Sequence, residues 1–216
     1  MQRYFKTGKG EYAEGDVFLG VRMSTVFRIA KDFVGMDGAG VKKLLNHQWH
    51  EARVGGVCIL DWEARRKKTP DARRKELCQL YLDNHQGINN WDIVDRGAMY
   101  VVGGYLFDKK RYVLYRLAKS KNIWERRMAI VSTGYFIRQR DLDDTFRIAA
   151  MLLNDKEDLI HKPTGWMLRF AGDKDRVRLV EFLEMHAAVM PRTMLRYAIE
   201  KFDKPQRDCY LSLRKK

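Results

Sequence analysis

The sequence predicts an all-α protein, a curved α-solenoid of antiparallel helix pairs that forms one domain over residues 1–216. Three observations support this prediction. Apolar residues recur at the three- and four-residue spacing of amphipathic helices, whereas strand signals are weak. Helix starts in the second half recur about every 30–40 residues, the period of helix-pair solenoids such as HEAT repeats. Each proline precedes a helical stretch, where its missing N–H group costs nothing. The prolines are Pro70, Pro163, Pro191 and Pro205.

The expected helices can be placed in order along the chain. The first runs through Val26 and Ile29, and a second, rich in small residues, runs through Val54 and Val57. Residues 100–102 could form a short strand, but the glycines that follow favour a closely packed helix. We expect about ten or eleven helices of about 10–17 residues, joined by short turns. Those of the second half begin near Asn90, Asn122, Lys162 and Met190.

The composition is that of a basic globular protein. Lys and Arg number 42 against 28 for Asp and Glu, which gives a formal net charge of +14. Such a charge favours a polyanionic partner, either nucleic acid or an acidic membrane surface. No apolar run approaches the roughly 20 residues that a membrane span needs. Residues 1–16 lack the hydrophobic stretch of a secretory signal, so we expect a cytoplasmic protein.

The cysteines and histidines show no metal-binding pattern. Cys58, Cys78 and Cys209 are far apart, and none has C-x-x-C or metal-ligand spacing. The five histidines form no recognisable ligand set either. We therefore expect reduced thiols, no metal and no other cofactor.

The first candidate site follows Asn90, which is expected to cap a helix. Trp91 and Asp95 are four residues apart, so they lie on one face of that helix. Two interpretations remain open at this point. The pair can face a ligand, or Trp91 can be a core aromatic and Asp95 a salt-bridge partner of a neighbour such as Arg96 or Arg127.

Two further helix starts combine a tryptophan with an arginine three residues later. Trp124 and Arg127 share one helix face, and Trp166 and Arg169 share another, with Gly165 permitting close approach of a backbone or a ligand. Taken singly, each pair more often reflects packing than function. Three tryptophan-and-charge helix starts at the repeat period would nevertheless converge on one concave, basic surface in a solenoid.

At these residues the chain resembles the DNA alkylation repair family, the AlkD-like alkylpurine DNA glycosylases built from HEAT-like repeats. The resemblance runs from about Phe18 to about Phe202. It departs at the start, where the chain begins abruptly and the loop at 5–16 is longer than in the best-known members. Four segments in order carry it, namely NWDIVD at 90–95, NIWERRMA at 122–129, KPTGWMLR at 162–169 and MPRTMLRYAI at 190–199.

The resemblance implies roles for individual residues. Trp91 and Trp166 correspond to the two tryptophans that hold the sugar and backbone at the lesion. Asp95 corresponds to the catalytic carboxylate, and Arg127 to a phosphate-contacting arginine. The other residues assigned to DNA binding are Lys162, Arg169 and Tyr4, of which Tyr4 lies in a loosely aligned region.

The expected chemistry follows from the charge of an alkylated purine. A purine alkylated at N3 or N7 is cationic, so it leaves as a neutral base without a general acid. A carboxylate beside the sugar can stabilise its developing oxocarbenium charge and orient water, which fits Asp95. Each indole face can attract a cation by about 0.5–2 kcal/mol. The basic runs at 65–68, 109–111 and 138–140 would either attract the DNA backbone or form solvated helix ends.

We therefore expect a DNA glycosylase that releases N3- and N7-alkylated purines from double-stranded DNA in base-excision repair. It would act as a monomer, associated with the nucleoid when bound to DNA. The alternative is a non-catalytic HEAT-like module that binds DNA structure or a protein partner. The joint presence of Trp91, Asp95, Arg127 and Trp166 separates the two, because a scaffold has no reason to keep a carboxylate between two tryptophans on a basic face.

Overall fold

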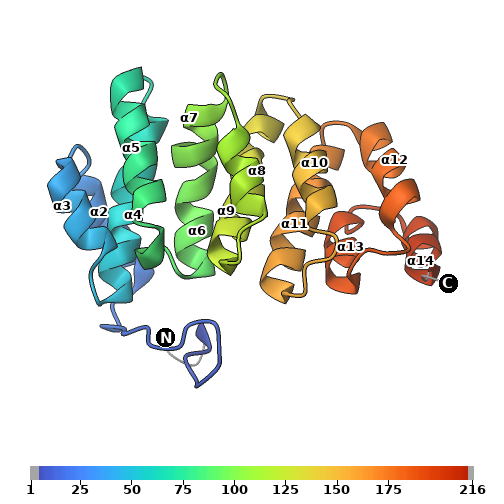
Figure 1. Cartoon of the computed structure of the whole chain (residues 1–216), viewed down its shortest axis with the longest axis horizontal. Coiled ribbons are helices and arrows are strands. Elements are labelled where there is room, and N and C mark those ends of the chain that lie inside the picture. Colours follow the sequence, from blue (N-terminus) through green and yellow to red (C-terminus); the bar gives the residue numbers. More distant parts are fainter. Residues whose placement is uncertain (1–4, 214–216) are drawn as a thin grey trace. The chain divides into compact units, whose positions relative to one another are not determined.

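The computed structural model describes residues 5–213, which are helical apart from the N-terminal segment and the connections (Figure 1). Within these residues the only extended pairing is an isolated parallel bridge between Val17 and Trp49, so the all-α prediction is confirmed. The chain divides into two compact units, unit 1 (Met1–Lys109) and unit 2 (Lys110–Lys216). The single domain, the HEAT-like solenoid and its concave basic face stay predictions.

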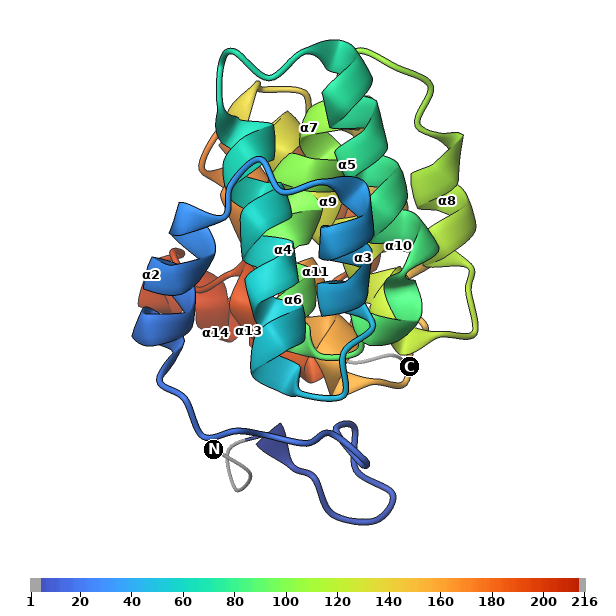
Figure 2. The same cartoon turned by 90° about the vertical axis from the view of Figure 1, so that its left-hand side faces the viewer.

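Unit 1 is built around one long buried helix. Its helices are α2 (Met23–Asp32), α3 (Gly38–Leu45), α4 (His50–Arg65), α5 (Asp71–Asp83), the 3₁₀ turn η1 (His85–Gly87), α6 (Trp91–Gly97), the π-helical turn η2 (Ala98–Gly103) and α7 (Gly104–Leu106). Helices α2, α3 and α6 pack against α4, the central helix of the unit in Figure 2. Small residues permit this approach, since a Cβ at Gly56 would lie only 3.1 Å from Leu45 Cδ2. The predicted small-residue helix is thus the core of the unit.

The helical run from α6 to α7 contains a local widening. Helix α6 has seven residues, fewer than expected, because the next turn, η2, is π-helical. Residues 100–102 lie in η2, so the helical interpretation of this stretch is confirmed and the strand is not. The glycine that permits close packing in this run is Gly97, where a Cβ would lie 2.4 Å from Tyr81 Cε2.

Unit 2 is built around the longest of its own helices. Its helices are α8 (Tyr112–Ala118), α9 (Ile123–Arg138), α10 (Asp143–Met151), α11 (Asp158–Gly172), α12 (Arg176–His186), α13 (Arg192–Ala198) and α14 (Lys204–Ser212). Helix α9 is buried along most of its length and packs against α8, α10 and α11. Helix α11 packs in turn against α12 and α13.

The prolines begin helices at three of the four predicted positions. Pro70 and Pro191 directly precede α5 and α13, and Pro205 lies in the first turn of α14. The prediction for Pro163 is wrong, because this residue lies inside α11, which begins at Asp158 and not near Lys162. A proline there leaves the carbonyl of Leu159 without its helical N–H donor. Nη1 of Arg127 donates to that carbonyl over 2.6 Å, which is how the helix tolerates the proline.

No helix in the described part of the chain combines the length and the apolar character that crossing a membrane requires. The three cysteines form no disulfide; Cys58 and Cys78 are buried, and Cys209 is exposed.

Candidate functional site

The pair Trp91 and Asp95 lies on α6, one turn apart, as the spacing predicted. Asn90 caps the helix, since its side-chain oxygen accepts the Trp91 N–H over 2.8 Å. Ile93 and Val94 are fully buried and attach the opposite side of α6 to the core. Trp91 and Asp95 are half-buried, so both reach the surface of unit 1 from one face.

The indole of Trp91 contacts a part of the chain to which the sequence had assigned no function. This is the N-terminal segment, defined here as residues 5–20. Nε1 of Trp91 donates to the hydroxyl of Tyr12 over 3.2 Å. The ring of Phe5 stacks on the indole, with centroids 5.7 Å apart and planes inclined by 29°. Phe5 is itself buried and stacks on Phe18, with centroids 5.2 Å apart.

A buried ionic network joins the N-terminal segment to the start of α6. Asp16 accepts from Nη2 of Arg53 over 2.6 Å and from Nδ2 of Asn90 over 3.1 Å. The imidazole of His50 is fully buried between two carboxylates. Its Nδ1 lies 3.4 Å from Asp16 Oδ2, and its Nε2 lies 2.9 Å from Asp92 Oδ2.

The network shifts the pKa values of both central groups. Burial, the largest effect on His50, opposes its charge, but the nearby carboxylates of Asp16 and Asp92 raise its pKa overall. Burial likewise raises the pKa of Asp16, yet its contact with His50, its hydrogen bond with Asn90 and the charge of Arg53 lower it overall. Both shifts favour an imidazolium held between carboxylates.

Trp124 and Arg127 are both buried in unit 2, which agrees with the packing interpretation of Trp124. Only 6% of Arg127 is exposed, and one of its nitrogens is committed to the Leu159 carbonyl. Arg127 therefore fixes the course of α11, a role that the sequence did not suggest.

Helix α11 carries three of the other candidates on one face, because Lys162, Trp166 and Arg169 are spaced by four and three residues. Trp166 is half-buried and meets Phe170 edge-on, with centroids 5.3 Å apart. The cations on this face are paired. Lys162 contacts Asp158 Oδ2 over 2.7 Å, which raises the pKa of the lysine, and Arg169 forms an ion pair with Glu200.

Gly165 serves the close approach that the sequence indicated, and the partner is the backbone of α13. A Cβ at this position would lie 2.3 Å from the carbonyl oxygen of Met194. Trp166, the next residue along α11, therefore has its helix seated directly on a neighbouring helix.

The basic runs differ in how far their charges are compensated. The four residues at 65–68 are exposed, as are Arg138 and Arg140, but Arg65 is paired with Asp61 over 2.9 Å. Lys109 instead contacts Asp71 and Asp108, and Arg111 contacts Asp141 and Asp144. Tyr4 lies outside the described residues.

Each unit thus brings part of the predicted set together. Unit 1 holds Trp91 and Asp95 on α6, and unit 2 holds Arg127 on α9 beside the α11 face of Lys162, Trp166 and Arg169. The residues that sequence reasoning missed are Tyr12, Asp16 and His50. Their side-chain contacts with one another and with α6 join residues at least 34 positions apart (Asp16 and His50), so no local spacing could have indicated them.

An all-α protein with tryptophans and charges on partly exposed helix faces is of the class that can bind a nucleic acid. The family model described as DNA alkylation repair enzyme matches residues 1–202. The chain therefore belongs to the DNA alkylation repair enzyme family. Membership indicates an enzyme of alkylation-damage repair with DNA as its substrate. Comparison with curated proteins gave no match.

Proposed function

We propose that this protein is a DNA glycosylase that hydrolyses the N-glycosidic bond of N3- and N7-alkylated purines in double-stranded DNA. The observation that carries the proposal is the placement of Trp91 and Asp95 one turn apart on the partly exposed face of α6, in a chain of a DNA alkylation repair family. The protein would act as a monomer within base-excision repair.

The proposed reaction needs little acid catalysis. The alkylated purine is cationic and departs with the electron pair of the glycosidic bond as a neutral base, while water adds to C1′ and loses a proton. Positive charge develops on the sugar as the bond breaks. The carboxylate of Asp95 stabilises this charge and orients the water, and the indole of Trp91 favours the cation.

Unit 2 would hold the DNA backbone. Trp166 offers a second indole on α11, and Lys162 and Arg169 flank it on the same face. Because Asp158 and Glu200 pair with these cations, a phosphate that binds there competes with two carboxylates. Arg127, whose Nη1 bonds the Leu159 carbonyl, carries a guanidinium, the group whose fork of N–H donors matches a phosphate.

The decisive experiment is base release from duplex DNA that contains 7-methylguanine, with the parent compared with Asp95→Asn. We expect Asp95→Asn to lower the rate of release by about 10²–10³-fold, the usual effect of removing one electrostatic contact to a transition state. Asp83→Asn is the matched control, because it removes the same charge from an exposed position of unit 1. The control should release base at the parental rate.

Two outcomes would count against the proposal in different ways. A parent protein that binds the duplex but releases no base would remove the glycosylase activity and favour the non-catalytic module. A parent that releases base no faster than Asp95→Asn would retain the activity but remove the role of Asp95.

A further inference from the structure

We propose that the N-terminal segment (residues 5–20) is a positioning element of the candidate site, in which Tyr12 and Phe5 fix the indole of Trp91 and His50 fixes the first turn of α6 through Asp92. The inference rests on the proposed function. It assigns to Tyr12, Phe5 and His50 a role that is exerted through Trp91 and not on the substrate directly.

The position of Trp91 in its helix makes such support necessary. Trp91 is the first residue of α6, and first-turn residues lack the complete set of helical hydrogen bonds. Its backbone N–H is bonded to the Asn90 side chain and not to a carbonyl of a preceding helical turn. The orientation of the indole therefore depends on tertiary contacts. Tyr12 holds the nitrogen edge of the ring and Phe5 lies against one face, while part of the indole stays exposed.

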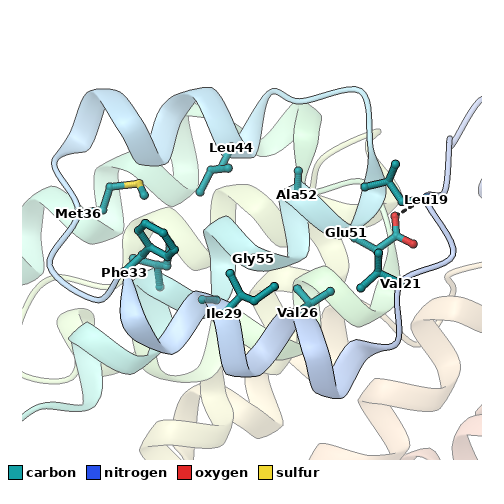
Figure 3. A pocket seen from close by; sticks show the side chains of 12 residues that line it. Leu19, Val21, Val26, Ile29, Phe33, Met36, Leu44, Glu51, Ala52 and Gly55 are labelled. Atoms are coloured by element: carbon teal, nitrogen blue, oxygen red, sulfur yellow. Dashed lines mark hydrogen bonds between the residues drawn. The ribbon is translucent and has the colours of Figure 1, made fainter.

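The N-terminal segment is in turn tied to the first turns of α4. The N–H of His50 donates to the Val17 carbonyl over 2.8 Å. The carboxylate of Glu51 accepts the N–H groups of Leu19 and Gly20 over 2.9 and 2.8 Å, and Figure 3 shows Glu51 turned toward Leu19. In Figures 1 and 2 the segment, drawn in dark blue, runs below the ends of unit 1 at which α4 and α6 begin. These anchors give a glycine-containing loop one defined path.

The apolar groove of Figure 3 borders this anchor at Leu19 and Glu51, but its lining includes none of Phe5, Tyr12 and Trp91. It has a volume of about 420 Å³ and is lined mainly by apolar side chains of α2, α3, α4 and the residues that flank α2. Each carboxylate oxygen of Glu51 already accepts one backbone N–H, so the carboxylate serves to anchor residues 19–20.

His50 connects the N-terminal segment with α6 in a single side chain. It lies between Asp16 of the segment and Asp92, the second residue of α6. Its ring also stacks on Phe18 and contacts Phe5, with centroids 4.6 and 5.0 Å apart. A displacement of the segment would therefore be transmitted to both Asp92 and the ring stack beneath Trp91.

Stability alone does not account for this arrangement. Replacing a buried ion network by apolar side chains of similar volume is often neutral or stabilising, and in some proteins the network instead specifies one geometry. Here four ionisable groups, Asp16, His50, Arg53 and Asp92, converge on one helix start. That helix start is the one that carries Trp91, which is why we assign the network to positioning.

Tyr12→Phe tests the proposal, because it removes the hydroxyl and keeps the ring. The chain has five tryptophans, so the indole N–H resonances can be resolved by NMR and that of Trp91 assigned with Trp91→Phe. We expect only the Trp91 resonance to move and its hydrogen exchange to quicken. We expect kcat for 7-methylguanine release to fall by about 2- to 10-fold, the effect of one net hydrogen bond, with affinity for undamaged DNA unchanged.

Tyr105→Phe is the matched control, since it removes a hydroxyl from a half-buried tyrosine of the same unit. It should alter neither the Trp91 resonance nor kcat. His50→Gln is the second variant, and it should shift the Trp91 resonance and lower kcat at least as much as Tyr12→Phe. If His50→Gln fails to fold, Tyr12→Phe still decides.

The proposal fails if Tyr12→Phe leaves the Trp91 resonance unmoved, or moves it with no change in kcat. If the parent protein releases no base, both the proposed glycosylase function and the positioning role are excluded. An active parent with an equally active Tyr12→Phe variant removes the positioning role alone, so the two failures are distinguishable.

Discussion

At the scale of single residues, the side chain of Arg127 has two roles, one structural and one proposed in DNA binding. Its Nη1 donates to the Leu159 carbonyl, which Pro163 leaves without a helical donor, and the proposed function gives the same guanidinium a DNA phosphate. The guanidinium has five N–H donors in a fixed fork, so the two bonds can coexist. A substitution of Arg127 therefore changes the fold of α11 as well as any phosphate contact.

A double-mutant cycle with Pro163 tests the structural role of Arg127. Arg127→Met should lower the free energy of unfolding by about 1–3 kcal/mol, because it leaves a buried carbonyl without a donor. In a Pro163→Ala background the loss should be smaller, since the restored backbone N–H can bond Leu159. Urea unfolding measures all four proteins. If the changes in unfolding free energy of the two single variants sum to that of the double variant within about 0.5 kcal/mol, the two residues are not coupled. Arg127 would then not compensate for Pro163.

The pH dependence of stability should reveal the charge on His50. The groups that face its imidazole are Asp16 from the N-terminal segment, Asp92 from α6 and, through Asp16, Arg53 from α4. Because folding raises the pKa of His50, its contribution is complete below the unfolded pKa of about 6.5 and is lost as pH rises through the folded pKa.

Asp16 behaves in the opposite sense. Folding lowers its pKa, so its contribution is present above the unfolded value of 3.8 and is lost as pH falls through the folded pKa. The pair therefore stabilises the protein together between about pH 4 and 6.5. Urea midpoints should decline above that window in the parent. The decline should be reduced in His50→Gln but not in His47→Gln, and an unchanged decline in His50→Gln would exclude a charged His50.

At the scale of helices, two glycines of unit 1 should respond oppositely to the same substitution. A Cβ at Gly97 would lie 2.4 Å from Tyr81 Cε2 and 2.8 Å from Val57 Cγ1, inside the contact that holds α6. Gly97→Ala should therefore destabilise the protein by about 1–3 kcal/mol. A Cβ at Gly55 would meet only Val26 Cγ1 at 3.8 Å, so Gly55→Ala should stabilise by about 0.5–1 kcal/mol. Equal effects of the two variants in thermal unfolding would contradict this account.

The helices also show which signals in the sequence are sufficient to predict where a helix begins. Asn90 and Pro70 were identified correctly because capping and proline rules act within a few residues. These local rules misplace Pro163 at a helix start. The residue that allows a proline inside α11 is Arg127, which lies 36 positions earlier in the chain and beyond the reach of such rules. The π-turn η2 was not foreseen because a single widened turn leaves the apolar period nearly unchanged.

In the candidate site, too, the features that depend on local spacing could be predicted and those that depend on long-range contacts could not. The shared face of Trp91 and Asp95 follows from helical spacing and could be predicted. Tyr12 and His50 could not, because their contacts with Trp91 and Asp92 join residues that are 79 and 42 positions apart in the sequence, which no local spacing indicates. Sequence reasoning thus located the residues proposed to face DNA but not those that orient them.

At the scale of the whole molecule, the net charge of +14 is unevenly available to a partner. Lys109 and Arg111 are each paired with two carboxylates, which reduces the field they present. In the run at 65–68, Arg65 is paired with Asp61, whereas Arg66, Lys67 and Lys68 are exposed. A polyanion should therefore respond to the exposed run more than to the paired cations, even though both contribute equally to the formal charge.

The salt dependence of DNA binding tests this distinction. If lysines contact phosphates, log K falls linearly with log[salt], with a slope of about 0.9 per neutralised phosphate. Lys67→Gln with Lys68→Gln should reduce that slope by about 1–2 and weaken binding to damaged and undamaged duplexes alike. Lys109→Gln should change it little, because Asp71 and Asp108 already neutralise this lysine. A slope near zero in the parent would mean that the surplus charge does not bind DNA, and equal effects of the two substitutions would mean that pairing does not decide which cations do.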